Sequence, residues 1–130
     1  KEIGVVVFGE NTFNTFPAPL PGRLNVVFTP DLNKPAKENV KWVTGDVAEA
    51  IKQLEADGHD KALLGGGAYL NSLFLEAGLI DEIILTIEPL IFGKGIGLFS
   101  KELDAKLELV ECEKINKDSV MIRYRVTHNA

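Results

Sequence analysis

The chain has 130 residues, of which 45% are hydrophobic and 25% charged, and at this length one domain buries roughly two-thirds of its unfolded surface. This balance excludes a disordered, collagen-like or coiled-coil protein, and no apolar run approaches the ~20 residues that a transmembrane helix needs. The net charge of -5 has the wrong sign for a surface that binds nucleic-acid phosphates. We therefore expect a single domain over residues 1–130, with no nucleic-acid or membrane partner.

The cysteine and histidine content indicates a reducing cellular compartment and argues against a structural metal site. One cysteine, Cys112, excludes an internal disulfide, and one thiol with two histidines is too little for a structural metal site. Cys112 alternates with Val110 and Lys114 in a predicted strand, which favours a buried, unreactive thiol. Residues 1–8 lack the basic and long apolar segments of a signal peptide. We expect a cytoplasmic protein that holds no metal.

The first half of the chain predicts strands joined by helical or irregular connections. Residues 3–8 are a continuous β-branched run, which is typical of a strand covered on both faces. Residues 24–28 predict a second strand that stops before a proline. After a polar loop, residues 40–43 predict a short third strand. Asp46 then opens a helix with one apolar face, and Gly58 ends it.

The second half adds another strand and helix and then a hairpin. Residues 61–64 predict a short buried strand, and residues 68–77 predict an amphipathic helix. Residues 81–89 predict a further strand. Residues 107–115 and 120–127 alternate in period two around a turn, which indicates a C-terminal β-hairpin. Because strands separated by helices pair in parallel through right-handed crossovers, we expect an α/β fold with a mixed sheet and helices on its faces.

The clearest candidate for chemistry is the triple glycine at residues 65–67, between a predicted strand and a predicted helix. In open α/β sheets, ligands lie beyond the carboxyl ends of strands, and a helix N-terminus attracts phosphate. A tight turn needs fewer glycines, because each one adds entropy to the unfolded chain. We therefore favour a phosphate site, although the spacing matches neither G-x-G-x-x-G nor the P-loop. Gly9 also follows a strand, and Asn11 and Thr12 after it fit a helix cap as well as a ligand contact.

Several short motifs lie in order along nearly the whole chain. They are Gly9-x-x-Thr12-Phe13, Pro19-x-Pro21-Gly22-Arg23-x-Asn25, Leu64-Gly65-Gly66-Gly67, Gly78-Leu79-Ile80-Asp81-Glu82, Pro89 and Phe92-Gly93-x-Gly95. Together they resemble the dihydrofolate reductase superfamily, and within it the branch related to the C-terminal reductase domain of bifunctional riboflavin biosynthesis proteins. The resemblance implies a three-layer α/β/α sandwich on a mixed, mostly parallel sheet, with NADPH across the carboxyl ends of its strands. The implied activity is hydride transfer to a small heterocycle, such as a pterin or a pyrimidine.

The same resemblance implies which residues contact the cofactor. The diphosphate is expected at Gly66 and Gly67. The other expected contacts are Gly65, Ala68 and Tyr69 beside them, Gly9, Asn11 and Thr12 on the opposite wall, and Thr29 near the adenosine end. No residue is recognisable as a proton donor, so the catalytic residues stay unassigned.

Departures from the family pattern leave alternatives open. The family carries Arg where this chain has Glu10, so like charge disfavours a 2′-phosphate unless Glu10 points away, and NADH becomes an alternative to NADPH. Arg23, Lys34 and Lys37 are either compensating charges or ordinary solvated side chains. Gly65 stands where riboflavin-pathway reductases carry a glutamate that faces substrate. This argues for a substrate other than the riboflavin-pathway pyrimidine.

A competing hypothesis follows from the start of the family pattern, because the family's first strand and helix would precede Lys1. A domain that lacks them would expose a sheet edge for another chain to cover. The alternative to a reductase is thus a non-catalytic or truncated nucleotide-binding domain of the same fold. In either case we expect a homodimer. Phe92 and Phe99, which flank the glycine-rich residues 93–97, fit either a ligand cover or a dimer contact.

Overall fold

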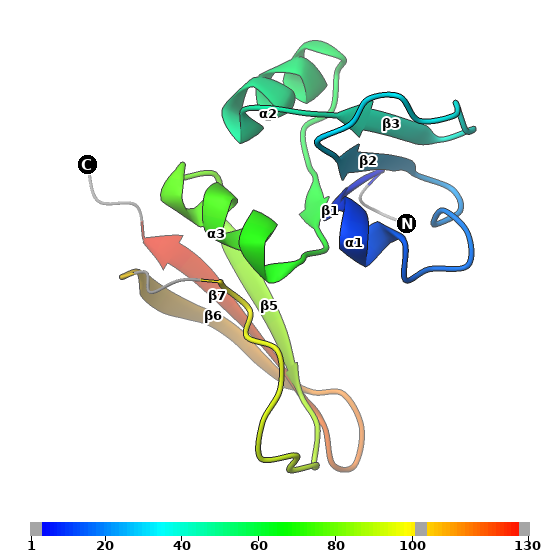
Figure 1. Cartoon of the computed structure of the whole chain (residues 1–130). Helices are drawn as coiled ribbons and strands as arrows, with labels where there is room; N and C mark the ends of the chain where they lie inside the picture. Colours follow the sequence, from blue (N-terminus) through cyan, green and yellow to red (C-terminus); the bar gives the residue numbers. More distant parts are fainter. Residues whose placement is uncertain (1–3, 101–103, 128–130) are drawn as a thin grey trace.

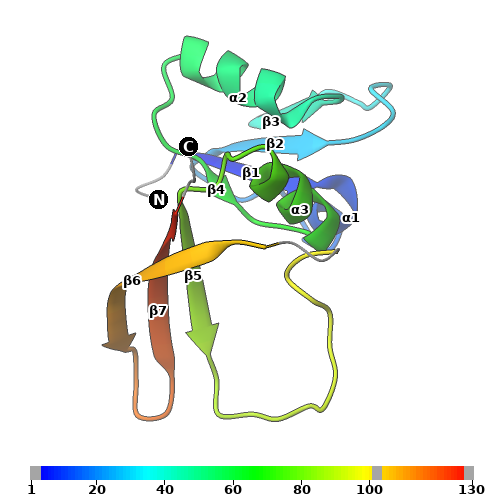
Figure 2. The ribbon, with the colours of Figure 1, turned by 90° about the vertical axis from the view of Figure 1, so that its left-hand side faces the viewer.

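The computed structural model describes residues 4–100 and 104–127. Its elements, in chain order, are β1 (Val5–Gly9), α1 (Glu10–Phe13), β2 (Leu24–Phe28), β3 (Val40–Val43), α2 (Val47–Ala56), β4 (Leu63–Leu64), α3 (Ala68–Glu76), β5 (Glu82–Ile87), β6 (Lys106–Lys114) and β7 (Val120–Thr127). Four strands form a parallel sheet in the order β3-β2-β1-β4, and three form an antiparallel sheet in the order β5-β7-β6. The antiparallel sheet extends away from the parallel one (Figures 1 and 2).

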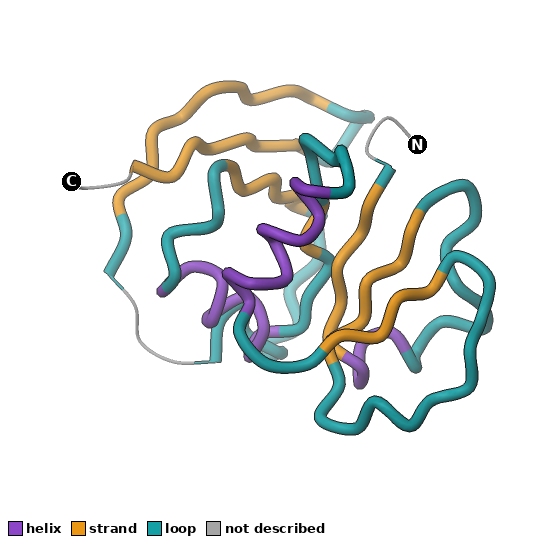
Figure 3. Tube along the Cα trace, turned by 90° about the horizontal axis from the view of Figure 1, so that it is seen from above, coloured by secondary structure: helices purple, strands orange, loops and turns teal. Residues whose placement is uncertain are grey.

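Strand β1 lies inside the parallel sheet, and both of its faces are covered. Val5 and Val7 belong to a core cluster that includes side chains of α2 and α3. Val6 and Phe8 point to the opposite face, where they pack with Phe13 of α1. This alternation explains the apolar run from Val5 to Phe8, since each of these residues packs on one of the two faces of the sheet. Figure 3 shows the strands and helices from above. The α/β fold with three layers is confirmed, while residue 3 of the expected first strand lies outside the described residues.

The helix boundaries come from local signals that the sequence already shows. Asp46 caps α2, because its Oδ1 accepts a hydrogen bond from the backbone N–H of Ala48 at 3.1 Å. Gly58 and Gly78 follow α2 and α3 with φ angles of 92° and 70°. Both angles lie in the left-handed region, which glycine adopts without a steric penalty. The predicted ends of the two helices are therefore confirmed to within a residue or two.

The antiparallel sheet contains the predicted hairpin, and β5 is paired along its other side. Every residue of β6 is exposed, and ion pairs join Arg123 to Glu82 and Glu111 across the three strands. The prediction that Cys112 is buried is wrong, because its thiol is exposed. Period-two alternation describes a strand with one covered face, but no described layer covers this edge strand on either side.

Parallel and antiparallel pairing are thus divided between two sheets that follow one another along the chain. Among the described residues, β4 is paired only with β1, and β5 only with β7, so each strand presents one unpaired edge. Helix α3 connects these two edge strands in sequence. No helix in the described ranges combines the length and apolar character needed to cross a bilayer.

Candidate functional site

Three glycines bring the ends of β1 and β4 together. The backbone N–H of Gly9 donates to the carbonyl of Gly66 at 2.8 Å. A Cβ atom on Gly9 would lie 3.9 Å from the backbone nitrogen of Gly67. The residues that the sequence assigned to two separate strand ends therefore form one corner, which we call the glycine corner (Gly9, Gly66 and Gly67). It lies at the carboxyl edge of the parallel sheet, where open α/β sheets bind ligands.

The glycine corner fits the diphosphate of a dinucleotide. Gly66 has a φ of 107° and open space where a Cβ would lie, so its backbone is accessible at close range. The peptide bond between Gly66 and Gly67 is cis. Gly67 is the N-cap of α3 and no side chain caps this helix, so the N–H groups of its first turn keep their hydrogen-bonding capacity for an anion.

The remaining residues of the predicted cofactor site surround this corner. Thr12 faces Gly67, since a Cβ on Gly67 would lie 3.0 Å from the Thr12 hydroxyl oxygen. Ala68 and Tyr69 are the first two residues of α3, and the Tyr69 ring is exposed. Asn11 lies in α1 and is also exposed. The structure thus gathers these predicted contacts at one edge of the sheet, on both sides of Gly9.

Packing explains why position 65 is a glycine, and this explanation differs from that for Gly66 and Gly67. A Cβ at this position would lie 2.3 Å from Cε1 of Phe8, a distance that carbon atoms do not tolerate. The first glycine of the triplet therefore allows β4 to approach a core phenylalanine. Its predicted contact with the cofactor stays a prediction.

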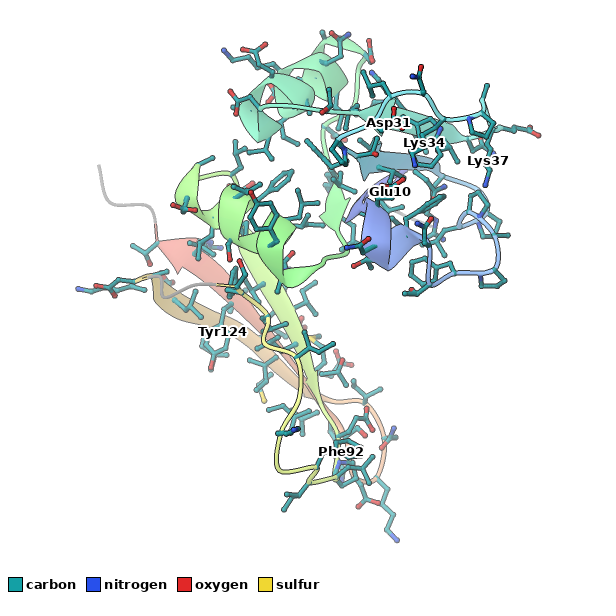
Figure 4. The ribbon with its side chains drawn as sticks, viewed as in Figure 1. Glu10, Asp31, Lys34, Lys37, Phe92 and Tyr124 are labelled. Atoms are coloured by element: carbon teal, nitrogen blue, oxygen red, sulfur yellow. The ribbon has the colours of Figure 1, made fainter. Side chains whose placement is uncertain are left out.

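A second polar group lies beside the glycine corner, at the ends of β1 and β2. The hydroxyl of Thr29 donates to Oε1 of Glu10 at 3.1 Å, and the ammonium of Lys34 pairs with Oε2 of the same carboxylate. The Glu10 side chain is 20% exposed and the Lys34 side chain 28%. Figure 4 shows Glu10, Asp31 and Lys34 close together at this edge of the sheet. We call Glu10, Thr29 and Lys34 the carboxylate cluster.

The electrostatics of the carboxylate cluster favour its charged form. The hydrogen bond from Lys34 is the main reason that the pKa of Glu10 lies below its usual value, although partial burial acts in the opposite direction. The bond to Glu10 likewise raises the pKa of Lys34. At neutral pH the cluster is therefore an intact ion pair that accepts a hydroxyl bond from Thr29.

The pairing of Glu10 with Lys34 is the main feature that sequence reasoning left open. Lys34 was one of several nearby cations, and Glu10 was expected either to point away or to weaken binding of a 2′-phosphate. A signal existed, because Glu10 and Thr29 directly follow neighbouring parallel strands, whose carboxyl ends meet at one edge of the sheet. Nothing local indicated which loop lysine would reach them. The described residues contain no group of three or more metal-ligating side chains.

The sequence of the chain is similar to a known protein family and to a curated relative. Residues 20–121 match the family model described as RibD C-terminal domain. The chain is 30% identical over 87 residues to the uncharacterized protein YyaP of Bacillus subtilis (strain 168), a match that covers 64% of this chain and 45% of that protein. This chain spans about half of the length of YyaP, so we do not assign the activity of the whole relative to this chain.

The chain shares its fold with solved structures of other proteins. One is a Shewanella sp. PV-4 protein named for riboflavin biosynthesis, with a TM-score of 0.83, 23% identity, and coverage of 97% of this chain and 75% of that one. Another is RibD of Acinetobacter baumannii, with a TM-score of 0.75, 17% identity, and coverage of 95% and 47%. At these identities the likeness is one of fold.

Proposed function

The chain belongs to the RibD C-terminal domain family, and we propose that it is an NAD(P)H-dependent reductase domain acting on a small heterocycle of the pterin or pyrimidine type. The observation that carries this proposal is the glycine corner, where an open Gly66 backbone meets the N-terminus of α3, which no side chain caps. When bound, the nicotinamide ring supplies the hydride. The protein's part is to bind and orient the two reactants.

Each group at the corner has a role that follows from its position. The N–H groups in the first turn of α3 donate hydrogen bonds to phosphate oxygens, and the helix dipole adds favourable charge. The Thr12 hydroxyl faces Gly67 from the other side and offers one more donor. The family resemblance implies that the adenosine end extends toward Thr29, and Thr29 lies at the same edge of the sheet because it follows β2, the neighbour of β1.

The substrate class is inferred from chemistry and from the names of similar proteins. The Shewanella protein is named for riboflavin biosynthesis and the Acinetobacter protein is RibD; both names point to heterocyclic substrates. Because Gly65 has no side chain to hold a substrate group, we propose a heterocycle other than the riboflavin-pathway pyrimidine. We also propose that the protein is cytoplasmic, because NADH and NADPH are available as reductants in the cytoplasm.

Calorimetric titration with NADPH and NADH tests the cofactor assignment. We expect at least one of them to bind with a Kd below about 1 mM, equivalent to roughly -4 kcal/mol. Gly66→Ala should weaken that binding at least tenfold, because the methyl group would enter the open space beside the diphosphate. Gly45→Ala is the matched control, since Gly45 also has a positive φ, 88°, and open space around it. Equal losses in the two variants, or no binding to the wild type, would contradict the proposal.

A second candidate is a nucleotide-binding domain whose sheet is completed by another chain, as in a homodimer. The unpaired edges of β4 and β5 favour it, since unpaired N–H and C=O groups at a sheet edge are templates for pairing. Native mass spectrometry and light scattering distinguish the two candidates. A monomer with full reductase turnover rejects the second, whereas a dimer that binds dinucleotide without turnover rejects the first.

A further inference from the structure

The carboxylate cluster has acceptor capacity that its own partners do not use. Each oxygen of an ionised carboxylate offers about two lone-pair sites. Oε1 of Glu10 accepts one bond from Thr29, and Oε2 pairs with Lys34. Both partners hold the carboxylate in place, because the Thr29 side chain is buried and Lys34 comes from the following loop. Glu10 is therefore an oriented acceptor that can still receive two hydroxyl groups.

The carboxylate cluster lies next to the glycine corner. Glu10 is the next residue after Gly9, and β1 lies between β4 and β2 in the sheet. Neighbouring strands are about 4.8 Å apart. A ligand that places its diphosphate at Gly66 and extends toward Thr29 therefore reaches Glu10 after one or two strand spacings. A ribose lies on each side of the diphosphate of a dinucleotide. In the proposed binding mode, in which the adenosine end extends toward Thr29, the ribose at this distance is the adenosine ribose.

The charge of the cluster argues against a further phosphate at this point. Lys34 is already paired with Glu10, and Asp31 lies close enough for its charge to act on both members of that pair. The charge of Lys34 is thus already balanced by Glu10, and Asp31 adds negative charge nearby. A phosphate ester placed here would be repelled by like charge, whereas neutral hydroxyls donate to carboxylate oxygens.

From this arrangement we propose that Glu10 binds the vicinal 2′- and 3′-hydroxyls of the adenosine ribose and makes the site selective for NADH over NADPH. The inference rests on the proposed function and deepens it, because it names which of the two nicotinamide dinucleotides the site takes. Thr29 and Lys34 act as positioning residues that hold the carboxylate. In Rossmann-type sheets, too, an acidic residue accepts a hydrogen bond from the ribose 2′-hydroxyl of NAD, although that residue lies at another position of the fold.

The test compares NADH and NADPH by calorimetry, since the two probes differ only in the 2′-phosphate. We expect the wild-type chain to bind NADH at least tenfold more tightly than NADPH. In Glu10→Gln that ratio should fall to within about threefold of one, because the amide removes the negative charge and one acceptor. Glu38→Gln, which removes the same charge from an exposed position in the loop that carries Lys34, should keep the wild-type ratio.

The outcomes separate the two proposals. Equal affinities in the wild type, or tighter binding of NADPH, overturn the selectivity while leaving the reductase assignment intact. An unchanged ratio in Glu10→Gln, or the same loss in Glu38→Gln, overturns the role of Glu10. If neither dinucleotide binds the wild type, the proposed function fails and the selectivity fails with it. The wild-type comparison needs no variant, so it decides the question even if Glu10→Gln does not fold.

Discussion

Gly65 lies directly against the ring of Phe8, so that a Cβ at position 65 would be 2.3 Å from Cε1 of that ring. Phe8 is itself packed against the rings of Phe13 and Phe16 and is buried. The ring therefore has little freedom to move away. A glycine at position 65 therefore lets the backbone hydrogen bonds from Gly65 to Val7 and from Gly9 to Gly66 form beside this ring.

Gly65→Ala should destabilise the fold by about 1–3 kcal/mol, the range for overpacking a filled core. Urea denaturation measures the change in the free energy of unfolding. Gly95→Ala is the control, because Gly95 has open space and no positive φ. The double variant with Phe8→Leu and Gly65→Ala should lose less unfolding free energy than the sum of the losses in the two single variants. Strict additivity of the two substitutions would contradict the steric explanation.

Asn25 is a buried residue that holds the segment between α1 and β2. Its side-chain amide donates to the carbonyls of Leu20, Arg23 and Asn39, and its Oδ1 accepts from the N–H of Leu20. Asn25→Ala should cost roughly 1–3 kcal/mol, because part-buried backbone groups lose their side-chain partner. Thermal or urea denaturation measures this loss, with the exposed Asn33→Ala as control. Equal stability of the two variants would refute the structural role of Asn25.

The pair of Glu10 and Lys34 should give the stability of the fold a defined pH dependence. The pKa of Glu10 lies below 4.5 because of Lys34, so the stabilisation is present above that value and is lost as the pH falls through the lowered pKa. The pKa of Lys34 lies above 10.5, so its contribution is full below that value and is lost as the pH rises through the raised pKa. The pair is therefore complete at neutral pH, and it is lost toward strongly acidic and strongly alkaline pH.

The contribution of the Glu10–Lys34 pair to stability can be tested by urea denaturation. The denaturation midpoints of the wild type and Glu10→Gln are compared across this pH range. We expect the difference between them to be largest near neutral pH and to shrink on acidification below the usual pKa of a glutamate. Glu38→Gln provides the background effect of removing one exposed carboxylate from the same loop. A difference that stays constant down to strongly acidic pH would show that the charge of Glu10 is not the cause.

The loop after β5 carries a group of exposed apolar side chains, which include Ile91 at 97%, Phe92 at 83% and Ile96 at 96% exposure. Figure 2 shows this loop as a wide excursion from the end of β5. Several exposed apolar side chains on one loop are consistent with an interaction site. If the chain forms a homodimer through this loop, the combined change Ile91→Ser and Phe92→Ser should shift light-scattering mass toward the monomer.

The unfolding free energy of that double variant should stay within about 0.5 kcal/mol of the wild type when both are compared as monomers, because the side chains are exposed. Leu32→Ser is the matched control, since Leu32 is an exposed leucine in a different loop. An unchanged dimer in the double variant, or a similar shift in the control, would rule out this loop as the contact.

Local sequence signals determined most elements of this protein. The run at residues 3–8, the Asp46 cap and the glycines after α2 and α3 act within one or two turns of chain, so their effects are visible without knowledge of distant contacts. The family resemblance assigned Gly9 and the triple glycine to one cofactor site, whereas the rule that parallel strands end at a common edge left open whether their two strands are neighbours. The residues of the glycine corner were therefore all predicted before their contacts were known.

Only the tertiary structure decided the features that depend on neighbours far apart in sequence. Glu10 meets Lys34 because loop residues return to the end of β1, and no local pattern encodes which lysine arrives. Gly65 matters to packing because Phe8 occupies the space beside it, and Cys112 is exposed because no layer within residues 4–100 and 104–127 covers β6. Alternation within a strand states which side chains share a face, but whether anything covers that face is a property of the whole assembly of elements.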